Sequence, residues 1–131
     1  MRLLLDTHVT LWALAASPKL APAARDLIAD LDNDIHVSAA SIWEIAIKHA
    51  LKRKGAGAMP ISASDALGYC LAAGYTLLPI TPAHAAAVEA LPAHHADPFD
   101  RLLIAQARAE PLRLMTHDAA LQRYDPNIIV V

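Results

Sequence analysis

The chain has 131 residues, a formal net charge of −2 at pH 7 and a single cysteine, Cys70. This length supports a hydrophobic core, so residues 1–131 are expected to form a single domain. One cysteine excludes an internal disulfide and a zinc site built from cysteines. The slightly acidic balance argues against a general nucleic-acid-binding surface.

Short apolar runs alternate with helical segments along the whole chain. Residues 2–5 form an apolar run without polar alternation, which is typical of a parallel strand buried on both faces. Further strands are predicted at residues 35–38, 75–80, 113–115 and 127–131. Helices are predicted at residues 9–16, from Pro18 or Pro22 to about 31, and at 39–54, 62–73, 82–91, 98–109 and 119–124. This alternation favours a three-layer α/β/α sandwich around a mostly parallel sheet of four to five strands.

The high apolar content has two explanations, a membrane segment or a buried sheet with an apolar surface for a partner. Residues 67–88 contain no Asp, Glu, Lys or Arg, and the stretch is long enough to cross a bilayer. It is interrupted, however, by glycines and prolines: Gly68, Gly74, Pro79 and Pro82. The apolar run at residues 2–5 meets Asp6 too soon for a signal peptide. We therefore expect a soluble cytoplasmic protein, with no membrane contact, that forms a homodimer through apolar surface.

The most informative stretch is residues 94–107, in which His-His-Ala-Asp-Pro-Phe-Asp leads into an apolar helix. Pro98 suits the first helical position, where a missing N–H is harmless. Asp97 suits the N-cap, and Asp100 falls at the third position, inside the positive end of the helix dipole. The pattern predicts a well-capped helix, and it does not by itself distinguish a cap from an active site.

Acidic side chains recur where the predicted strands end. Asp6 follows the first strand, and Asp118 lies shortly after the fourth. Glu44 lies in the helix after the second strand, while Asp97 and Asp100 open the helix before the fourth. Ligands of open parallel sheets bind outside the carboxyl ends of the strands. If the first and fourth strands are neighbours, Asp6 and Asp118 therefore flank one crevice.

Each acid also has a structural explanation. Asp6 and Asp118 could cap the helices that follow them, and Glu44 could form a capping box with Ser41 or pair with Lys48. Several carboxylates in one crevice repel, by about 4 kcal/mol for two charges about 4 Å apart at an effective dielectric of about 20. A divalent cation relieves this repulsion. All-oxygen ligation favours Mg²⁺ or Mn²⁺, either of which can bind a phosphodiester and activate water.

Four stretches occur in a distinctive order: Leu3-Leu4-Leu5-Asp6-Thr7-His8, residues 37–45, residues 91–107 and Thr116-His117-Asp118. Together they resemble the PIN-domain ribonucleases, and within them the VapC-type toxins of bacterial toxin–antitoxin pairs. The resemblance implies an α/β/α sandwich, Mg²⁺- or Mn²⁺-dependent cleavage of RNA, and inhibition by a small antitoxin protein. It implies a set of catalytic, metal-binding acids: Asp6, Glu44, Asp100 and Asp118. Asp97 matches a further acidic residue of the subgroup, although its capping position makes it the most structural of the five.

Other side chains near the same crevice could contact substrate or orient the acids. Thr7 and Thr116 could hydrogen-bond to the neighbouring carboxylates, and Arg101 could pair with Asp97 or contact a phosphate. A basic run at the end of one helix is either a solvated terminus or a contact for an RNA backbone: Lys48, His49, Lys52, Arg53 and Lys54.

Two alternatives from other classes stay open. His8, His95 and His117 could form a zinc-dependent hydrolase site with Asp97, although their spacing is a weak zinc signal. A non-catalytic protein-binding module on the same fold would use the apolar surface alone. Binding of Mg²⁺ or Mn²⁺ separates the nuclease from the module, and tightly held zinc would indicate the hydrolase.

Overall fold

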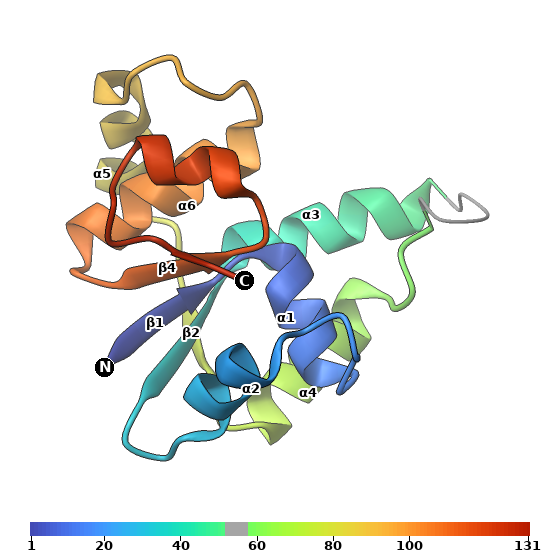
Figure 1. Cartoon of the computed structure of the whole chain (residues 1–131). Helices are drawn as coiled ribbons and strands as arrows, with labels where there is room; N and C mark the ends of the chain where they lie inside the picture. Colours follow the sequence, from blue (N-terminus) through green and yellow to red (C-terminus); the bar gives the residue numbers. More distant parts are fainter. Residues whose placement is uncertain (52–57) are drawn as a thin grey trace.

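A computed structural model describes residues 1–51 and 58–131 and contains a five-stranded parallel sheet (Figure 1). Its strands are β1 (Arg2–Leu5), β2 (Asp34–Ser38), β3 (Thr76–Leu78), β4 (Arg113–Thr116) and β5 (Ile129–Val130). The order across the sheet is β3-β2-β1-β4-β5, and every neighbouring pair is parallel. The predicted sheet is confirmed.

Helices cover both faces of this sheet (Figure 1), which gives the expected three layers. The α-helices are α1 (Thr7–Leu14), α2 (Pro22–Ala29), α3 (Ala39–Ala50), α4 (Ala63–Ala72), α5 (Pro82–Ala87) and α6 (Pro98–Ala109). Two 3-10 turns follow α5 and β4, η2 (Val88–Ala90) and η3 (Ala119–Arg123). No helix in the described part of the chain combines the length and the apolar character needed to cross a membrane.

The core lies on both faces because successive side chains of a strand point to opposite sides. Leu4 of β1 packs with α6 on one face, whereas Leu3 and Leu5 pack with α1 and α2 on the other. All three leucines are completely buried. Burying each one stabilises the fold by about 1.5–3 kcal/mol, which explains why this strand carries no polar alternation.

The chain reverses its direction of travel across the sheet next to β1. It runs outward from β1 to β2 and β3, and then returns to place β4 on the other side of β1. Leu5 of β1 is level with Val37 of β2 and Met115 of β4. The residues that follow these strands therefore emerge together at the carboxyl edge, where open α/β sheets bind ligands.

The element ends differ from the prediction in ways that have local causes. α1 begins at Thr7 rather than residue 9, because Asp6 already caps it. β3 ends at Leu78 rather than residue 80, since Pro79 has no N–H to continue the ladder. The predicted helix at 82–91 is α5 followed by η2. The last predicted turn of the 39–54 helix falls largely outside the described residues, as do three residues of the basic run, Lys52, Arg53 and Lys54.

Candidate active site

Asp6 is fixed at the carboxyl edge by contacts on both sides of its carboxylate. Its Oδ1 accepts a hydrogen bond from the backbone N–H of Val9 at 2.8 Å, so it caps α1. Its Oδ2 accepts from Thr116 Oγ1 at 2.6 Å and from the His117 backbone N–H at 3.2 Å. The side chain is buried. Asp6 is therefore both a helix cap and a rigidly oriented buried carboxylate that ties β1 to the end of β4.

Glu44 points from α3 toward the same edge and is also buried. Its Oε1 accepts from Thr7 Oγ1 at 2.5 Å, and its Oε2 accepts from Lys48 Nζ at 2.6 Å. The suggested capping box with Ser41 is wrong, because α3 begins earlier and is capped by Ser38. The i,i+4 pairing with Lys48 is confirmed.

The N-terminus of α6 carries Asp97 and Asp100. Asp97 Oδ1 accepts from the backbone N–H groups of Phe99 at 2.8 Å and Asp100 at 3.3 Å, so its predicted role as N-cap is confirmed. Asp100 Oδ2 lies 3.0 Å from Nε2 of His95 in the preceding loop. Asp97 thus fixes where α6 begins, and this places Asp100 in the first turn of the helix, beside His95.

Asp118 follows β4 and caps η3 through a hydrogen bond from the Ala120 N–H to Oδ1 at 3.0 Å. Its own backbone N–H donates to Thr116 Oγ1 at 3.0 Å. Its other oxygen, Oδ2, lies 3.5 Å from His95 Nε2. The predicted cap is correct, and it leaves the second oxygen directed toward Asp100 and His95.

These acids line one cavity of about 520 Å³ at the carboxyl edge of the sheet, together with Lys48: Asp6, Glu44, Asp97, Asp100 and Asp118. The pKa of Asp100 is raised from its ordinary value to about 6, chiefly by burial and then by the charges of Asp97 and Asp6, against the opposing effect of His95. A raised carboxyl pKa is expected for a partly buried acid that shares a cavity with other acids.

The donor set fits a divalent ion. His95, Asp100 and Asp118 each offer one ligand atom, and these atoms lie within 4.8 Å of one another. Asp6 and Glu44 line the same cavity without belonging to this tighter group. Carboxylate oxygens suit Mg²⁺ and Mn²⁺. The sequence predicts His95 beside the crevice, as a packing residue, a phosphate contact or a zinc ligand, but it does not indicate the contacts of His95 with Asp100 and Asp118. The position of His95 two residues before the helix cap was the available signal.

The structure does not assemble the suggested zinc site. His8 and His117 line the cavity, but both rings lie against Trp12, with ring centroids 6.1 Å and 4.7 Å away respectively. His117 Nδ1 also lies 2.9 Å from the carbonyl oxygen of Val131. Among the described residues, His95 alone of the suggested zinc ligands belongs to a close group of metal-ligating atoms.

The guanidinium of Arg101 bonds to partners other than the suggested Asp97, and Arg101 is not among the residues that line the acidic cavity. Its Nη1 donates to the carbonyl of Pro92 at 2.9 Å and lies 3.1 Å from the Tyr124 hydroxyl. Its Nη2 donates to the carbonyls of Val88 at 3.1 Å and Leu91 at 3.4 Å. Val88 O also accepts from the Leu91 backbone N–H at 3.1 Å, and the fork of arginine N–H groups adds donors for all three carbonyls.

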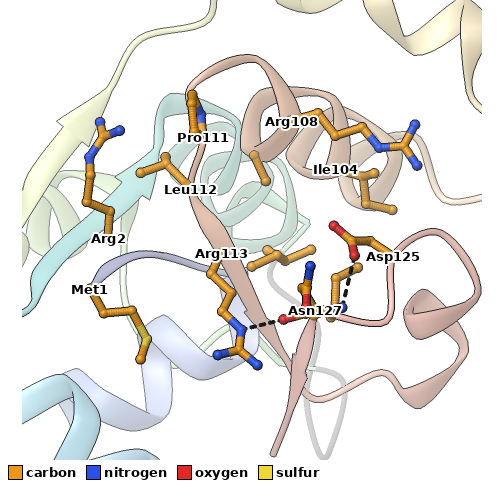
Figure 2. Close-up of a pocket in the computed structure, with 12 residues that line it drawn as sticks. Met1, Arg2, Ile104, Arg108, Pro111, Leu112, Arg113, Asp125 and Asn127 are labelled. Carbon is orange, nitrogen blue, oxygen red and sulfur yellow. Dashed lines mark hydrogen bonds between the residues drawn. The ribbon is translucent and has the colours of Figure 1, made fainter.

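A second cavity, of about 490 Å³, lies at the opposite edge, where β1 and β4 begin (Figure 2). Arg2, Arg108 and Arg113 border it, and Asp125 is its acidic side chain. Figure 2 shows the three guanidinium groups pointing away from one another. Binding sites need polar groups that converge on a ligand, so the acidic cavity is the better candidate.

Solved structures of similar fold include VapBC2 from Rickettsia felis bound to promoter DNA, with 18% identity and a TM-score of 0.68 over 100% of this chain and 98% of that one. FitAcB from Neisseria gonorrhoeae has 19% identity and a TM-score of 0.63, over 98% of this chain and 96% of that one. A toxin–antitoxin complex from Klebsiella pneumoniae has 17% identity and a TM-score of 0.64, over 97% of this chain and 95% of that one.

At such identities the likeness shows the fold, and a comparison with curated proteins finds no match. The sequence itself carries the family signal. The family model of the PIN domain matches residues 3–126, which include every acid of the cavity. The chain belongs to the PIN-domain family.

Proposed function

We propose that this protein is an endoribonuclease that depends on Mg²⁺ or Mn²⁺ and acts as the toxin of a toxin–antitoxin pair. The observation that carries the proposal is the gathering of acids from separate parts of the chain into one cavity: Asp6, Glu44, Asp100 and Asp118. The raised pKa of Asp100 supports it, since burial and the neighbouring charges of Asp97 and Asp6 disfavour a further negative charge in the cavity. Membership of the PIN-domain family supports it as well.

The proposed chemistry assigns the carboxylates to holding the ion and to accepting the proton of an attacking water. A bound divalent ion lowers the pKa of that water and offsets the charge of the phosphate. The water oxygen forms the new bond to phosphorus, and the bond to the 3′-oxygen breaks. Thr116 orients Asp6 and Thr7 orients Glu44 through the hydrogen bonds described above. These threonines are therefore proposed as positioning residues rather than substrate contacts.

Binding of RNA is proposed to be local, because the chain as a whole is slightly acidic. Lys48 lines the cavity beside Glu44 and is the basic side chain placed to meet a phosphate. Most of the charge that attracts the phosphodiester would then come from the bound cation. This predicts RNA binding that strengthens with added Mg²⁺ or Mn²⁺.

The proposed partner is an antitoxin protein. One of the similar structures described above is a toxin–antitoxin complex from Klebsiella pneumoniae. By analogy, we propose that the free chain is active in the cytoplasm and that the partner inhibits it. Co-expression with the antitoxin should restore growth that expression of the chain alone arrests.

A homodimer is proposed from the apolar surface of α3 and α4. Large apolar side chains are exposed on these two helices: Trp43, Ile47, Leu67, Tyr69 and Leu71. Between them lies an apolar hollow of about 280 Å³, lined by residues that include Ile42, Trp43 and Leu67. Exposed apolar patches of this kind mark association surfaces.

Sedimentation equilibrium tests the homodimer. The wild type should be dimeric, and Leu71→Lys should weaken the dimer by at least about tenfold, because it places a charge in the apolar contact. Leu31→Lys is the matched control, since Leu31 is 98% exposed and lies outside α3 and α4. A monomeric wild type, or a Leu71→Lys variant that dimerises normally, contradicts this part of the proposal.

RNA cleavage by the purified chain, free of any partner, tests the main proposal. Cleavage should require Mg²⁺ or Mn²⁺ and stop with a chelator. Asp6→Asn should slow it on the order of 100-fold or more, since several kcal/mol of transition-state stabilisation depend on the ion. Asp125→Asn removes the same charge from the opposite cavity and should cleave normally. Cleavage in chelator, or by Asp6→Asn at the wild-type rate, overturns the proposal. Absence of both ion binding and cleavage favours the binding module.

A further inference from the structure

His95 occupies an unusual position for a histidine in an acidic cavity. Its Nε2 lies 3.0 Å from Asp100 Oδ2 and 3.5 Å from Asp118 Oδ2, so it sits between two carboxylates from different elements. Its side chain is 23% exposed and comes from the loop that precedes α6. The neighbouring His94 is exposed and instead lies edge-on to Tyr124, with ring centroids 5.1 Å apart.

Most carboxylate oxygens of the remaining acids accept hydrogen bonds from other donors. Asp6 accepts from Thr116 and two backbone N–H groups, and Glu44 accepts from Thr7 and Lys48. Asp97 uses Oδ1 as the cap of α6. Within the described residues, the ligand atoms that converge are therefore one imidazole nitrogen and the oxygens of Asp100 and Asp118.

The separations suit ligands that share one ion. Donor atoms bound to a first-row metal at about 2.0–2.2 Å, and lying next to each other in its coordination shell, are about 3 Å apart. Two of the contacts in the group are 3.0 and 3.5 Å. A hydrogen bond also explains either contact alone, but it does not explain why all three ligand atoms lie within 4.8 Å of one another.

We infer that His95 is a metal ligand and that its nitrogen makes this site prefer Mn²⁺ to Mg²⁺. The inference rests on the proposed function and sharpens it, because acids alone would accept both ions. Mg²⁺ is a hard ion that takes oxygen ligands, whereas affinity for a nitrogen-containing site rises along the first transition series. An imidazole among carboxylates therefore favours Mn²⁺ selectively.

Calorimetric titration with MnCl₂ and with MgCl₂ tests the preference. Wild type should bind Mn²⁺ at least about tenfold more tightly than Mg²⁺. His95→Ala should weaken Mn²⁺ binding by about 10–100-fold, the range seen when a metal site loses a supporting group. The same change should alter Mg²⁺ binding by less than about threefold. His94→Ala is the matched control, and it should bind both ions as the wild type does.

Pulsed electron paramagnetic resonance of bound Mn²⁺ tests ligation directly. A coordinated imidazole gives a ¹⁴N coupling that a hydrogen-bonded histidine outside the coordination shell does not give. The coupling should be present in the wild type and in His94→Ala, and absent from His95→Ala.

The outcomes separate this inference from the proposed function. If Mn²⁺ binds without a nitrogen coupling, or if His95→Ala keeps the wild-type preference for Mn²⁺ over Mg²⁺, His95 is not a ligand while the nuclease proposal stands. If the wild type binds neither ion, the proposed function fails and the inference fails with it.

Discussion

The two edges of the sheet carry cavities of nearly equal size, about 520 Å³ at the carboxyl edge and about 490 Å³ at the amino edge. The carboxyl-edge cavity gathers five acids. The amino-edge cavity is bordered by Arg2, Arg108 and Arg113 (Figure 2). Size therefore does not identify the site; what differs is whether the charged groups converge.

Backbone geometry explains the difference. At the carboxyl edge, β1 and β4 deliver Asp6 and Asp118, and the start of α6 adds Asp100 to the same space. At the amino edge each arginine instead satisfies a carbonyl of its own. Arg2 donates to Glu110, Arg108 to Tyr124, and Arg113 to Asn127. The carboxyl edge beside β1, where the chain reverses its direction across the sheet, thus brings charged side chains together in one cavity, whereas at the opposite edge they point apart.

The largest expected effect is on catalysis. It is found by removing one acidic charge from each edge of the sheet in turn. Asp100→Asn should reduce RNA cleavage on the order of 100-fold, because it removes a proposed ion ligand. Asp125→Asn should change it less than about twofold, since Asp125 lies at the amino edge. Initial rates on one RNA at saturating Mn²⁺ measure both. Equal losses in the two variants would mean that the edges do not differ in function.

The second prediction compares how much two arginines, Arg101 and Arg113, contribute to the stability of the fold. Arg101→Ala should lower the free energy of unfolding by about 2 kcal/mol, because three carbonyls and a hydroxyl lose the hydrogen bonds that the guanidinium donates. Arg113→Ala, which frees one exposed carbonyl, should cost less than about 0.5 kcal/mol. Urea denaturation gives both values. An Arg101→Ala variant that is as stable as the wild type would contradict the structural role assigned to this side chain.

The smallest expected effect is a gain in stability. In chelator at pH 7.5, Asp100→Asn should raise the free energy of unfolding by about 1–2 kcal/mol, because it removes a partly buried charge beside Asp97 and Asp6. Denaturation by urea measures it. A variant less stable than the wild type would show that Asp100 is not under electrostatic strain.

The raised pKa of Asp100 also predicts that the stability of the fold depends on pH. The native Asp100 carboxyl has a pKa of about 6, whereas the unfolded carboxyl has its ordinary pKa of 3.8. Between these values the native state binds more protons, so the Asp100 contribution to stability falls as pH rises from about 4 to 6. The advantage of Asp100→Asn should therefore vanish near pH 4 and be complete above about pH 7.

Much of the fold and of the candidate site could be predicted from local sequence. The apolar run before Asp6 predicts a buried parallel strand, and the Asp97-Pro98 pair predicts the start of α6. The condition under which Asp6 and Asp118 flank one crevice is met, because β1 and β4 are neighbours, but the order of the other strands does not follow from the sequence.

What sequence could not predict depends on contacts between distant residues. The sequence suggests that Thr7 and Thr116 bond to carboxylates, but it does not identify the partners: Thr116 bonds to Asp6 across 110 positions, and Thr7 bonds to Glu44 across 37. Arg101 is expected to pair with Asp97 or to contact a phosphate, but its side chain bonds to the Val88 carbonyl and the Tyr124 hydroxyl instead. The contacts of His95 with Asp100 and Asp118 depend on the relative positions of a loop, α6 and the end of β4, and the only local signal was the place of His95 two residues before the helix cap.

The most direct test of the central claim is a titration of ¹⁵N-labelled protein with Mn²⁺, followed by NMR. Paramagnetic broadening acts within a limited distance of the ion, so it reports which edge the ion occupies. We predict that the amide signals of Thr7, Asp100 and Asp118 disappear at substoichiometric Mn²⁺. Those of Arg2, Arg113 and Asn127, at the opposite edge, should persist. Equal broadening at both edges, or none at the carboxyl edge, would contradict this prediction.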